Sequence, residues 1–232
     1  MKYKRVLFKI SGESLAGESK TGIDFDSVLN ICESIKECYD AGCEVAIVVG
    51  GGNFWRGKYH EDMDRLNADH IGMLATTMNA IALEDGFSKL GVEARVQTGV
   101  EMREIAEYYI TNRALHHLNK GRIMIFGCGT GKPFFSTDTG AALRAAEIKA
   151  DVIIKATKTD GVFNKDPNKF KNAKVYSKIT YMDVLNNKLG VMDSTAVTLC
   201  MENNIPIIVL NMNKKHYMYR AVKGDNVGTV IK

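Results

Sequence analysis

Several residue types and patterns that would indicate a particular function are scarce or missing in this sequence. Cysteine occurs five times, an odd number, with no C-x-x-C pair, and the five histidines lack the spacing of metal ligands. This cysteine usage argues against a disulfide framework and a zinc site, and it favours a reducing compartment. The adjacent pair His116–His117 is interpreted as part of a helix surface.

Long apolar runs are also missing. No stretch approaches the roughly 18 apolar residues of a membrane span. The N-terminal sequence MKYKRVLFKISGES begins with basic residues, but Lys9 interrupts its apolar part, which a signal peptide would not tolerate. These absences predict a cytoplasmic protein without a membrane partner.

Charge is not concentrated anywhere along the chain. The net charge is +4, and no basic run, RNA-binding signature or zinc finger is present, so no nucleic-acid partner is expected. A nucleic-acid-binding regulator would need a concentrated basic face. Hydrophobic residues (45%) and charged residues (25%) have the proportions of a soluble globular protein. With no linker, repeat or low-complexity tract, we expect a single domain over residues 1–232.

Short apolar, β-branched runs alternate with longer helical patterns. Consecutive apolar positions are typical of strands covered on both faces, and this alternation predicts an α/β fold with a mostly parallel sheet between helices. We expect Asp26 and Thr137 to be helix N-caps, and Gly42, Gly91 and Gly121 to end helices. The predicted strands are 5–10, 43–49, 92–98, 122–127, 151–157 and 206–211, and the predicted helices lie near 26–40, 66–90, 102–119, 137–149, 193–203 and 214–222.

In such sheets, ligands bind at the carboxyl ends of the strands. Four predicted strands run into unusual loops: KISGES, VVGGGNFWRG, FGCGTGKPFFSTDTG and KATKTDGVFNKDP. Glycines let backbone amides surround an anion, and Lys9 and Arg56 supply fixed positive charge. The loops together indicate two phosphorylated ligands that meet at one edge of the sheet.

Two well-known phosphate motifs fail in these loops. A P-loop ending at Gly131-Lys132 would need glycine at Phe126 and a hydroxyl residue at Pro133. A dinucleotide fingerprint starting at Gly50 would need its third glycine at Trp55, which argues against a Rossmann oxidoreductase. Trp55 itself suits packing better than stacking on a ligand.

Taken together, the loops resemble those of the bacterial uridylate (UMP) kinases, members of the amino acid kinase superfamily. The matching stretches follow one another along almost the whole chain: FKISGESL, GGGNFWRG, ADHIGMLATTMNAIAL, GTGKPFFSTDT, ADVIIKATKTDGVF, VMDSTA, IPIIVLNM and GTVI. The resemblance implies a three-layer αβα sandwich and the reaction ATP + UMP → ADP + UDP in pyrimidine nucleotide biosynthesis. It further implies Mg²⁺ carried with ATP rather than held in a dedicated protein site, and a homohexamer activated by GTP and inhibited by UTP.

The resemblance also implies roles for individual residues. The residues expected at the ATP site are Lys9, Ile10, Ser11, Gly12, Gly52, Arg56, Thr157, Phe163 and Asp166. Those expected to bind UMP are Gly51, Asp69, Thr130, Gly131, Lys132, Pro133, Phe134, Phe135, Ser136 and Thr137. Catalysis is expected to involve Lys9, Arg56, Asp138 and Asp193. The GTP-responsive loop is expected at Gly17, Glu18, Ser19, Lys20, Thr21 and Gly22.

Two positions depart from the family pattern. The family more usually has asparagine where this chain has Lys132, and residues 17–23 match the activation loop in position better than in sequence. The alternatives are another small-molecule kinase of the superfamily, namely an acetylglutamate, carbamate, aspartate or isopentenyl phosphate kinase, and a non-catalytic nucleotide-binding regulator. Such a regulator would not need Lys9, Asp138 and Asp193 together.

Overall fold

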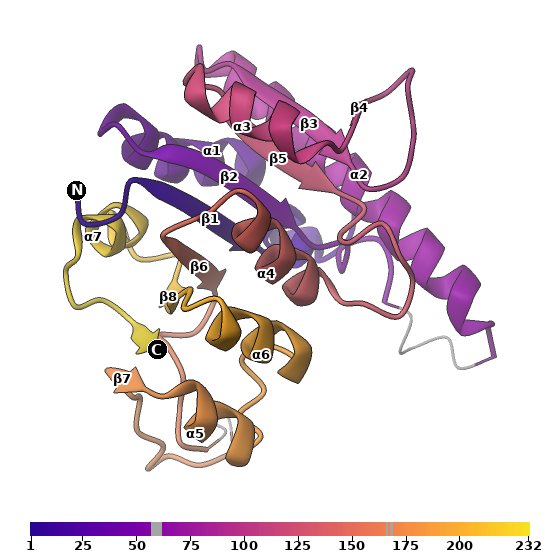
Figure 1. Cartoon of the computed structure of the whole chain (residues 1–232). Coiled ribbons are helices and arrows are strands. Elements are labelled where there is room, and N and C mark those ends of the chain that lie inside the picture. The colour runs from indigo at the N-terminus through magenta and orange to yellow at the C-terminus, as the bar shows by residue number, and fades with distance from the viewer. Residues whose placement is uncertain (57–61, 166, 168) are drawn as a thin grey trace.

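The computed structural model describes residues 1–56, 62–165, 167 and 169–232. Within them the strands form one sheet in the order β4-β3-β5-β2-β1-β6-β8-β9-β7 (Figure 1). All neighbouring strands are parallel except β8 and β9, which run antiparallel. The strands are β1 (Arg5–Ile10), β2 (Glu44–Val49), β3 (Ala94–Thr98), β4 (Glu107–Tyr108), β5 (Ile123–Gly127), β6 (Val152–Thr157), β7 (Lys178–Ile179), β8 (Ile207–Asn211) and β9 (Thr229–Ile231).

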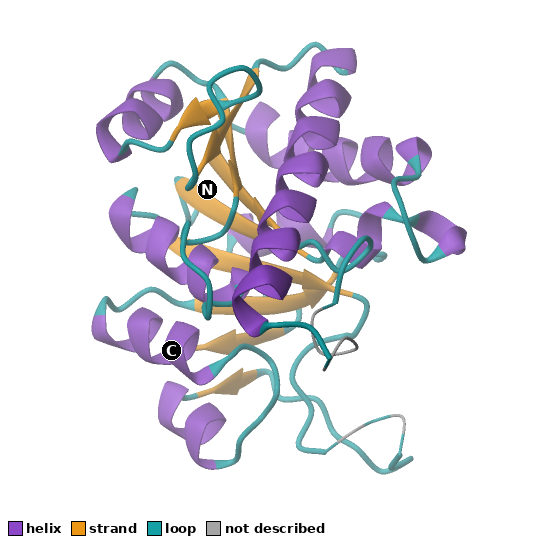
Figure 2. Ribbon diagram, turned by 90° about the vertical axis from the view of Figure 1, so that its right-hand side faces the viewer, coloured by secondary structure: helices purple, strands orange, loops and turns teal. Residues whose placement is uncertain are grey.

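Helices cover both faces of the sheet (Figure 2), which confirms the predicted αβα sandwich. One face packs against α1 (Phe25–Asp40), α2 (Arg65–Lys89) and α7 (Tyr217–Lys223). The other packs against α3 (Thr111–Asn119), α4 (Thr137–Glu147), α5 (Tyr181–Asn186) and α6 (Ser194–Glu202). Two short 3₁₀ helices, η1 (Gly12–Leu15) and η2 (Gly17–Ser19), follow β1. None of the helices described here is long and apolar enough to cross a bilayer.

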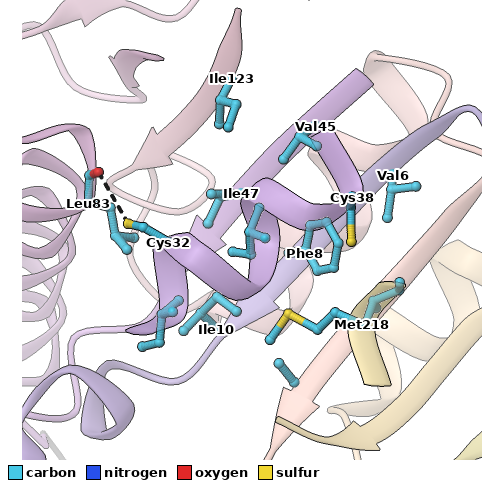
Figure 3. Packing of buried hydrophobic residues seen from close by; sticks show 14 of the residues in the cluster. Val6, Phe8, Ile10, Cys32, Cys38, Val45, Ile47, Leu83, Ile123 and Met218 are labelled. Atoms are coloured by element: carbon cyan, nitrogen blue, oxygen red, sulfur yellow. Dashed lines mark hydrogen bonds between the residues drawn. The ribbon is translucent and has the colours of Figure 1, made fainter. Parts of the chain in front are cut away.

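The alternation of side chains along β1 divides the core into two layers. Phe8 and Ile10 join the apolar cluster under α1, where Cys32 packs (Figure 3), whereas Leu7 joins the cluster under α4. Burying a side chain such as Phe8 contributes roughly 1.5–3 kcal/mol. Since successive strand residues face opposite ways, Lys9 must lie on the same face as Leu7, toward α4.

The N-caps of two helices lie one or two residues before the predicted positions. Asp24, not Asp26, caps α1, because its carboxylate accepts a hydrogen bond from the Asp26 amide. Ser136, not Thr137, caps α4 by accepting from the amides of the next turn. The expected helix-ending glycines all adopt left-handed backbone angles, with φ of 91°, 73° and 74° at Gly42, Gly91 and Gly121.

The prediction of a helix over 102–119 was wrong in its first half. Residues Glu107 and Tyr108 form β4, which pairs with β3, and the helix starts only at Thr111. Pairing with a neighbouring strand therefore outweighs the local helical pattern. The interpretation of His117 as a surface residue was also wrong, because it is buried and lies 3.1 Å from the Glu107 carboxylate.

Candidate active site

The four loops singled out in the sequence follow β5, β2, β1 and β6, which are four consecutive strands of the sheet. Because these strands are mutually parallel, the loops leave the sheet at the same edge, as predicted. Their backbones lie close together. A Cβ atom added to Gly12 would lie 2.5 Å from the carbonyl oxygen of Gly50, so only glycine fits there.

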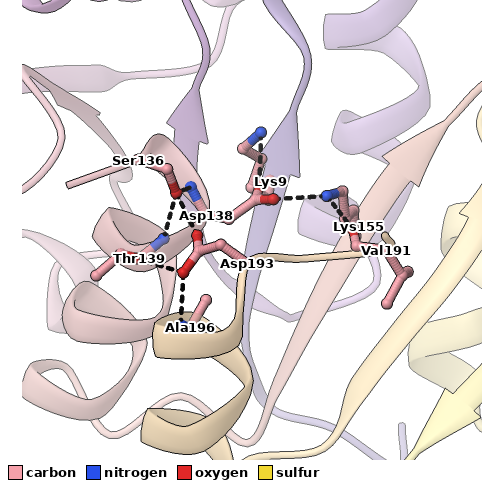
Figure 4. Close-up of polar contacts among 8 residues, drawn as sticks. All are labelled: Lys9, Ser136, Asp138, Thr139, Lys155, Val191, Asp193 and Ala196. Atoms are coloured by element: carbon pink, nitrogen blue, oxygen red, sulfur yellow. Dashed lines mark hydrogen bonds and ion pairs between the residues drawn. The ribbon is translucent and has the colours of Figure 1, made fainter. Parts of the chain in front are cut away.

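Three charged side chains form the centre of this edge (Figure 4). Lys9 of β1 and Lys155 of β6 are register partners on adjacent strands, so both project toward α4. Asp138, in the first turn of α4, lies between them. Its Oδ1 is 2.9 Å from Nζ of Lys9 and its Oδ2 is 2.7 Å from Nζ of Lys155. Two cations and one anion leave this cluster positively charged, which suits the binding of phosphates.

The pKa values in this cluster are shifted by burial and by the neighbouring charges. Burial opposes ionisation of Asp138, but the positive charges of Lys9 and Lys155 outweigh it and hold the pKa of the carboxyl below its usual value. Burial lowers the pKa of Lys155; the Asp138 carboxylate opposes this shift and the Lys9 charge adds to it. No role was predicted for Lys155 from the sequence. The position of Lys155 beside Lys9 follows only from the pairing of β1 with β6.

Asp193 joins the start of α4 to the start of α6. Its carboxylate accepts hydrogen bonds from the hydroxyls of Ser136 and Thr139, and from the Ala196 amide at 3.0 Å (Figure 4). Ser136 in turn caps α4, whose first turn carries Asp138. Asp193 therefore fixes the helix that presents Asp138 to the lysines. Its predicted part in catalysis stays a prediction.

One cavity beside the charged cluster lies between α2 and the loop after β5. This α2 cavity has a volume of about 330 Å³ and is lined by Gly51, Trp55, Ala68, Asp69, Gly72, Met73, Thr76, Cys128, Gly129, Lys132, Phe135, Ser136 and Thr137. Six of the residues predicted to bind UMP are therefore in its wall. Thr130 instead faces a neighbouring, more apolar cavity that Lys132 and Phe135 also border. Gly131, Pro133 and Phe134 belong to the same loop but not to the wall of the α2 cavity.

Asp69 connects α2 to this loop. Its Oδ2 accepts a hydrogen bond of 2.7 Å from the Phe134 amide and one of 3.0 Å from Nε of Arg65. The loop itself needs unusual backbone angles, with φ of 60° at Cys128 and 79° at Gly131. Asp69 thus lies both in the cavity wall and at the point where α2 holds the loop.

A second cavity, of about 690 Å³, lies on the opposite side of Lys155, beyond β6. Thr157 and Phe163, both predicted for the ATP site, are part of the wall of this β6 cavity. Asp166, predicted for the same site, lies outside the described residues. Lys155 lines the β6 cavity and contacts Asp138, so the charged cluster lies at the border of this cavity.

The remaining predicted ATP residues lie along the loops after β1 and β2. Ile10 ends β1 and is buried, Ser11 follows it, and Gly12 begins η1. An ion pair joins the Arg56 guanidinium to the Glu13 carboxylate, and Gly52 lies against both side chains. The structure therefore brings Arg56 to the loop of Ser11 and Gly12.

The predicted regulatory segment, residues 17–22, is tied to the glycine loop after β2. Asn53 Nδ2 donates to the Gly22 carbonyl at 2.7 Å, and the Thr21 hydroxyl donates to the Asn53 carbonyl. Asn53 also exchanges two side-chain hydrogen bonds with the buried Asn79 of α2, whose Nδ2 donates to the Gly50 carbonyl. This asparagine pair was not predicted from the sequence, although an asparagine within an apolar helical stretch was a usable signal.

Comparison with known proteins identifies the family. Residues 4–211 match the model of the amino acid kinase family. This chain belongs to that family.

Solved structures with similar folds include the UMP kinase of Bacillus anthracis (41% identity, TM-score 0.96, covering all of this chain and 97% of the other). The UMP kinase of Ureaplasma parvum is 36% identical, with a TM-score of 0.93 and full coverage of both chains. The uridylate kinase of Archaeoglobus fulgidus is 27% identical, with a TM-score of 0.73 and full coverage of both. Within the amino acid kinase family, the chain is an enzyme of the UMP kinase group.

Proposed function

We propose that this enzyme transfers the γ-phosphoryl group of ATP to UMP, forming ADP and UDP in pyrimidine nucleotide biosynthesis. The observation that carries the proposal is the position of the charged cluster, with a cavity on either side of it. ATP occupies the β6 cavity and the loop at Ser11–Gly12, and UMP occupies the α2 cavity. One domain over residues 1–232 supplies both sites, and the reaction takes place in the cytoplasm.

The main obstacle to this reaction is electrostatic. Two unit charges 4 Å apart repel by about 4 kcal/mol at an effective dielectric constant of 20, and two nucleotides bring several such pairs together. Lys9, Lys155 and Arg56 offset part of this repulsion, together with amides of the glycine loops. The same groups stabilise the charge on the transferred phosphoryl group in a loose transition state.

Asp138 acts by positioning rather than by accepting a proton. Its two carboxylate oxygens each face an ammonium group, and its lowered pKa keeps it ionised. The acceptor needs no general base, because the second pKa of a phosphomonoester is about 6 and its oxygen is already ionised at neutral pH. Asp138 therefore holds the ammonium groups of Lys9 and Lys155 in place between the two nucleotides.

The side chains at the cluster fit a Mg²⁺ ion that is bound to ATP. The oxygens of Asp138 face lysines and those of Asp193 accept from hydroxyls and an amide, so neither carboxylate is arranged as a metal ligand. When bound, Mg²⁺ would neutralise charge on the ATP phosphates. The chain's own part is to orient those phosphates with Lys9, Ser11 and Gly12.

The proposal is tested by following ADP release with Mg²⁺-ATP and a panel of acceptors: UMP, CMP, dUMP, AMP, carbamate, N-acetylglutamate, aspartate and isopentenyl phosphate. We expect UMP to give the highest kcat/KM. A preference for an acceptor that is not a nucleotide would indicate the alternative, another small-molecule kinase of the superfamily. No turnover with any acceptor, combined with nucleotide binding, would indicate a non-catalytic regulator.

We also propose that the chain assembles into a homohexamer whose activity rises with GTP and falls with UTP. Part of the support is a row of exposed apolar side chains at helical spacing on α2, namely Ile71, Leu74, Met78 and Ile81. An exposed apolar row of this kind is typical of a surface that another subunit covers. The link from residues 17–22 through Asn53 to the glycine loop gives a regulatory segment a direct contact with the site. Light scattering and the same assay with added GTP or UTP test both parts.

A further inference from the structure

Arg144 is a buried cation that the mechanism above does not use. It lies on α4 with 4% of its surface exposed, two turns away from Asp138. Buried arginines are rare unless they are paired, so each of its contacts requires an explanation. Arg144 contacts a carboxylate, an aromatic ring and a backbone carbonyl of the loop after β5.

Two of these contacts fix the orientation of the guanidinium group. Nη1 lies 2.6 Å from Oε2 of Glu147, and the guanidinium carbon lies 3.6 Å from the centre of the Tyr109 ring. The Tyr109 hydroxyl donates to the same Glu147 oxygen at 2.7 Å. Tyr109 in turn packs edge-on against Phe126, the penultimate residue of β5. The group is therefore fixed before any ligand binds.

The third contact reaches the loop that borders the α2 cavity. Nη2 of Arg144 donates to the carbonyl of Gly129 at 3.3 Å. Gly129 has a φ of 54° and follows Cys128 at 60°, so consecutive residues adopt left-handed angles. For a residue other than glycine, such angles persist only where surrounding contacts enforce them. From inside the cavity, the Thr76 hydroxyl accepts from the Cys128 amide, so the turn is held from both sides.

Helix α4 also comes unusually close to this turn. A Cβ atom on Gly140 would lie 3.1 Å from Cα of Gly129, so the glycine lets the helix pack directly on the loop. Arg144 lies one turn further along the same helix and contacts the same residue. The loop therefore rests on α4, the helix whose first turn carries Asp138.

We propose that Arg144 is a positioning residue for the acceptor nucleotide. By donating to Gly129 it holds the 127–131 turn in the shape that forms one wall of the α2 cavity, and it couples that wall to the helix of Asp138. This inference rests on the proposed function, in which UMP occupies the α2 cavity. Arg144 does not touch UMP itself.

The test compares Arg144→Met with the double variant Arg144→Met/Glu147→Gln and with Glu147→Gln alone. Because hydrogen bonds from charged donors are the stronger ones, we expect Arg144→Met to raise the KM for UMP by about 10- to 100-fold. The KM for ATP should change by less than about twofold, since the β6 cavity does not border this turn. Glu147→Gln keeps the contact with Gly129 and an amide oxygen that can accept from Nη1 of Arg144, so both KM values should stay near those of the wild type although the loss of the carboxylate lowers Tm.

The double variant separates positioning from stability. Arg144→Met leaves Glu147 without its cation, so part of any loss in Tm comes from that carboxylate. Neutralising Glu147 in the double variant should recover Tm while the KM for UMP stays high. If the KM for UMP recovered together with Tm, Arg144 would have only a structural role and the inference would be overturned.

Hydrogen–deuterium exchange of the 127–131 amides gives a readout that does not depend on activity. We expect faster exchange in both Arg144 variants of the ligand-free protein, but not in Glu147→Gln. Wild-type exchange rates in the double variant would overturn the inference even if no acceptor had been found. Absence of UMP turnover in the wild type would instead refute the proposed function, while exchange would still decide the role of Arg144 in the turn.

Discussion

Replacing Asp138 with asparagine tests the charged cluster directly. The substitution keeps the shape of the side chain but removes the anion that lies 2.9 Å from Lys9 and 2.7 Å from Lys155. At an effective dielectric constant of 20, each of these attractions amounts to about 6 kcal/mol before the cost of burial is subtracted. Removing one partner from a buried ion pair typically costs about 3–5 kcal/mol. In a protein of this size, such a loss lowers Tm by roughly 6–20 °C.

The pH dependence of this loss gives a second, more specific prediction. In the folded wild type the pKa of Lys155 is already lowered, mainly by burial and against the effect of Asp138. Without the Asp138 carboxylate the pKa of Lys155 should fall further. The folded variant would then bind fewer protons than the unfolded chain over a wider pH range, and its stability should rise with pH through that range. The deficit in Tm relative to the wild type should therefore be smaller at pH 9 than at pH 7.

Thermal unfolding of the wild type and variant at equal concentration, at pH 7 and pH 9, measures both effects. Asp40→Asn is the matched control, because Asp40 forms an exposed ion pair with Lys36 at helical spacing. Exposed pairs contribute about 0–1 kcal/mol, so the control should barely change Tm at either pH. If Asp138→Asn behaved like the control, or if its deficit grew at pH 9, the electrostatic account of the cluster would be refuted.

Three further predictions follow from the site and its surroundings. Lys9→Ala should lower kcat by about 10²- to 10³-fold while changing the KM for UMP only a few-fold, because Lys9 acts mainly in the transition state. Steady-state kinetics measures both constants, and near-normal turnover would contradict the prediction. Gly51→Ala should destabilise the protein by about 1–3 kcal/mol, because an added Cβ would lie 2.9 Å from the Gly72 carbonyl oxygen. A Cβ on Gly190 would meet open space, so Gly190→Ala is the control in the same unfolding experiment. Leu74→Glu, at a side chain 53% exposed on α2, should dissociate the proposed assembly; light scattering that showed an unchanged mass would argue against an interface there.

Much of the fold could be predicted from the sequence because the central strands are apolar at consecutive positions. β1, β2, β5 and β6 were all found in this way, and the loops that follow them leave the sheet at one edge, as predicted. The short outer strands could not be found. β4 and β7 each have two residues, too few for a pattern to emerge, and they exist only because a neighbouring strand pairs with them.

The candidate site was only partly accessible from the sequence for a related reason. Lys9 could be recognised because it lies one residue before the end of a strand and precedes a glycine turn. Lys155 also lies near the end of a strand, but its importance depends on lying beside Lys9, which the register of β1 and β6 determines. Contacts of this kind, like the one between Arg144 and Gly129, join residues far apart in the chain and leave no local pattern.

The pairing of Lys9 with Lys155 also limits which insertions and deletions the gene can tolerate. Inserting or deleting a single codon within β1 would turn Lys9 to the opposite side of the sheet, into the layer occupied by Phe8 and α1. The chain could still contain every residue of the site and yet bring no pair of ammonium groups to Asp138. Alterations of length should therefore be tolerated in the outer loops and eliminated by selection in these two strands.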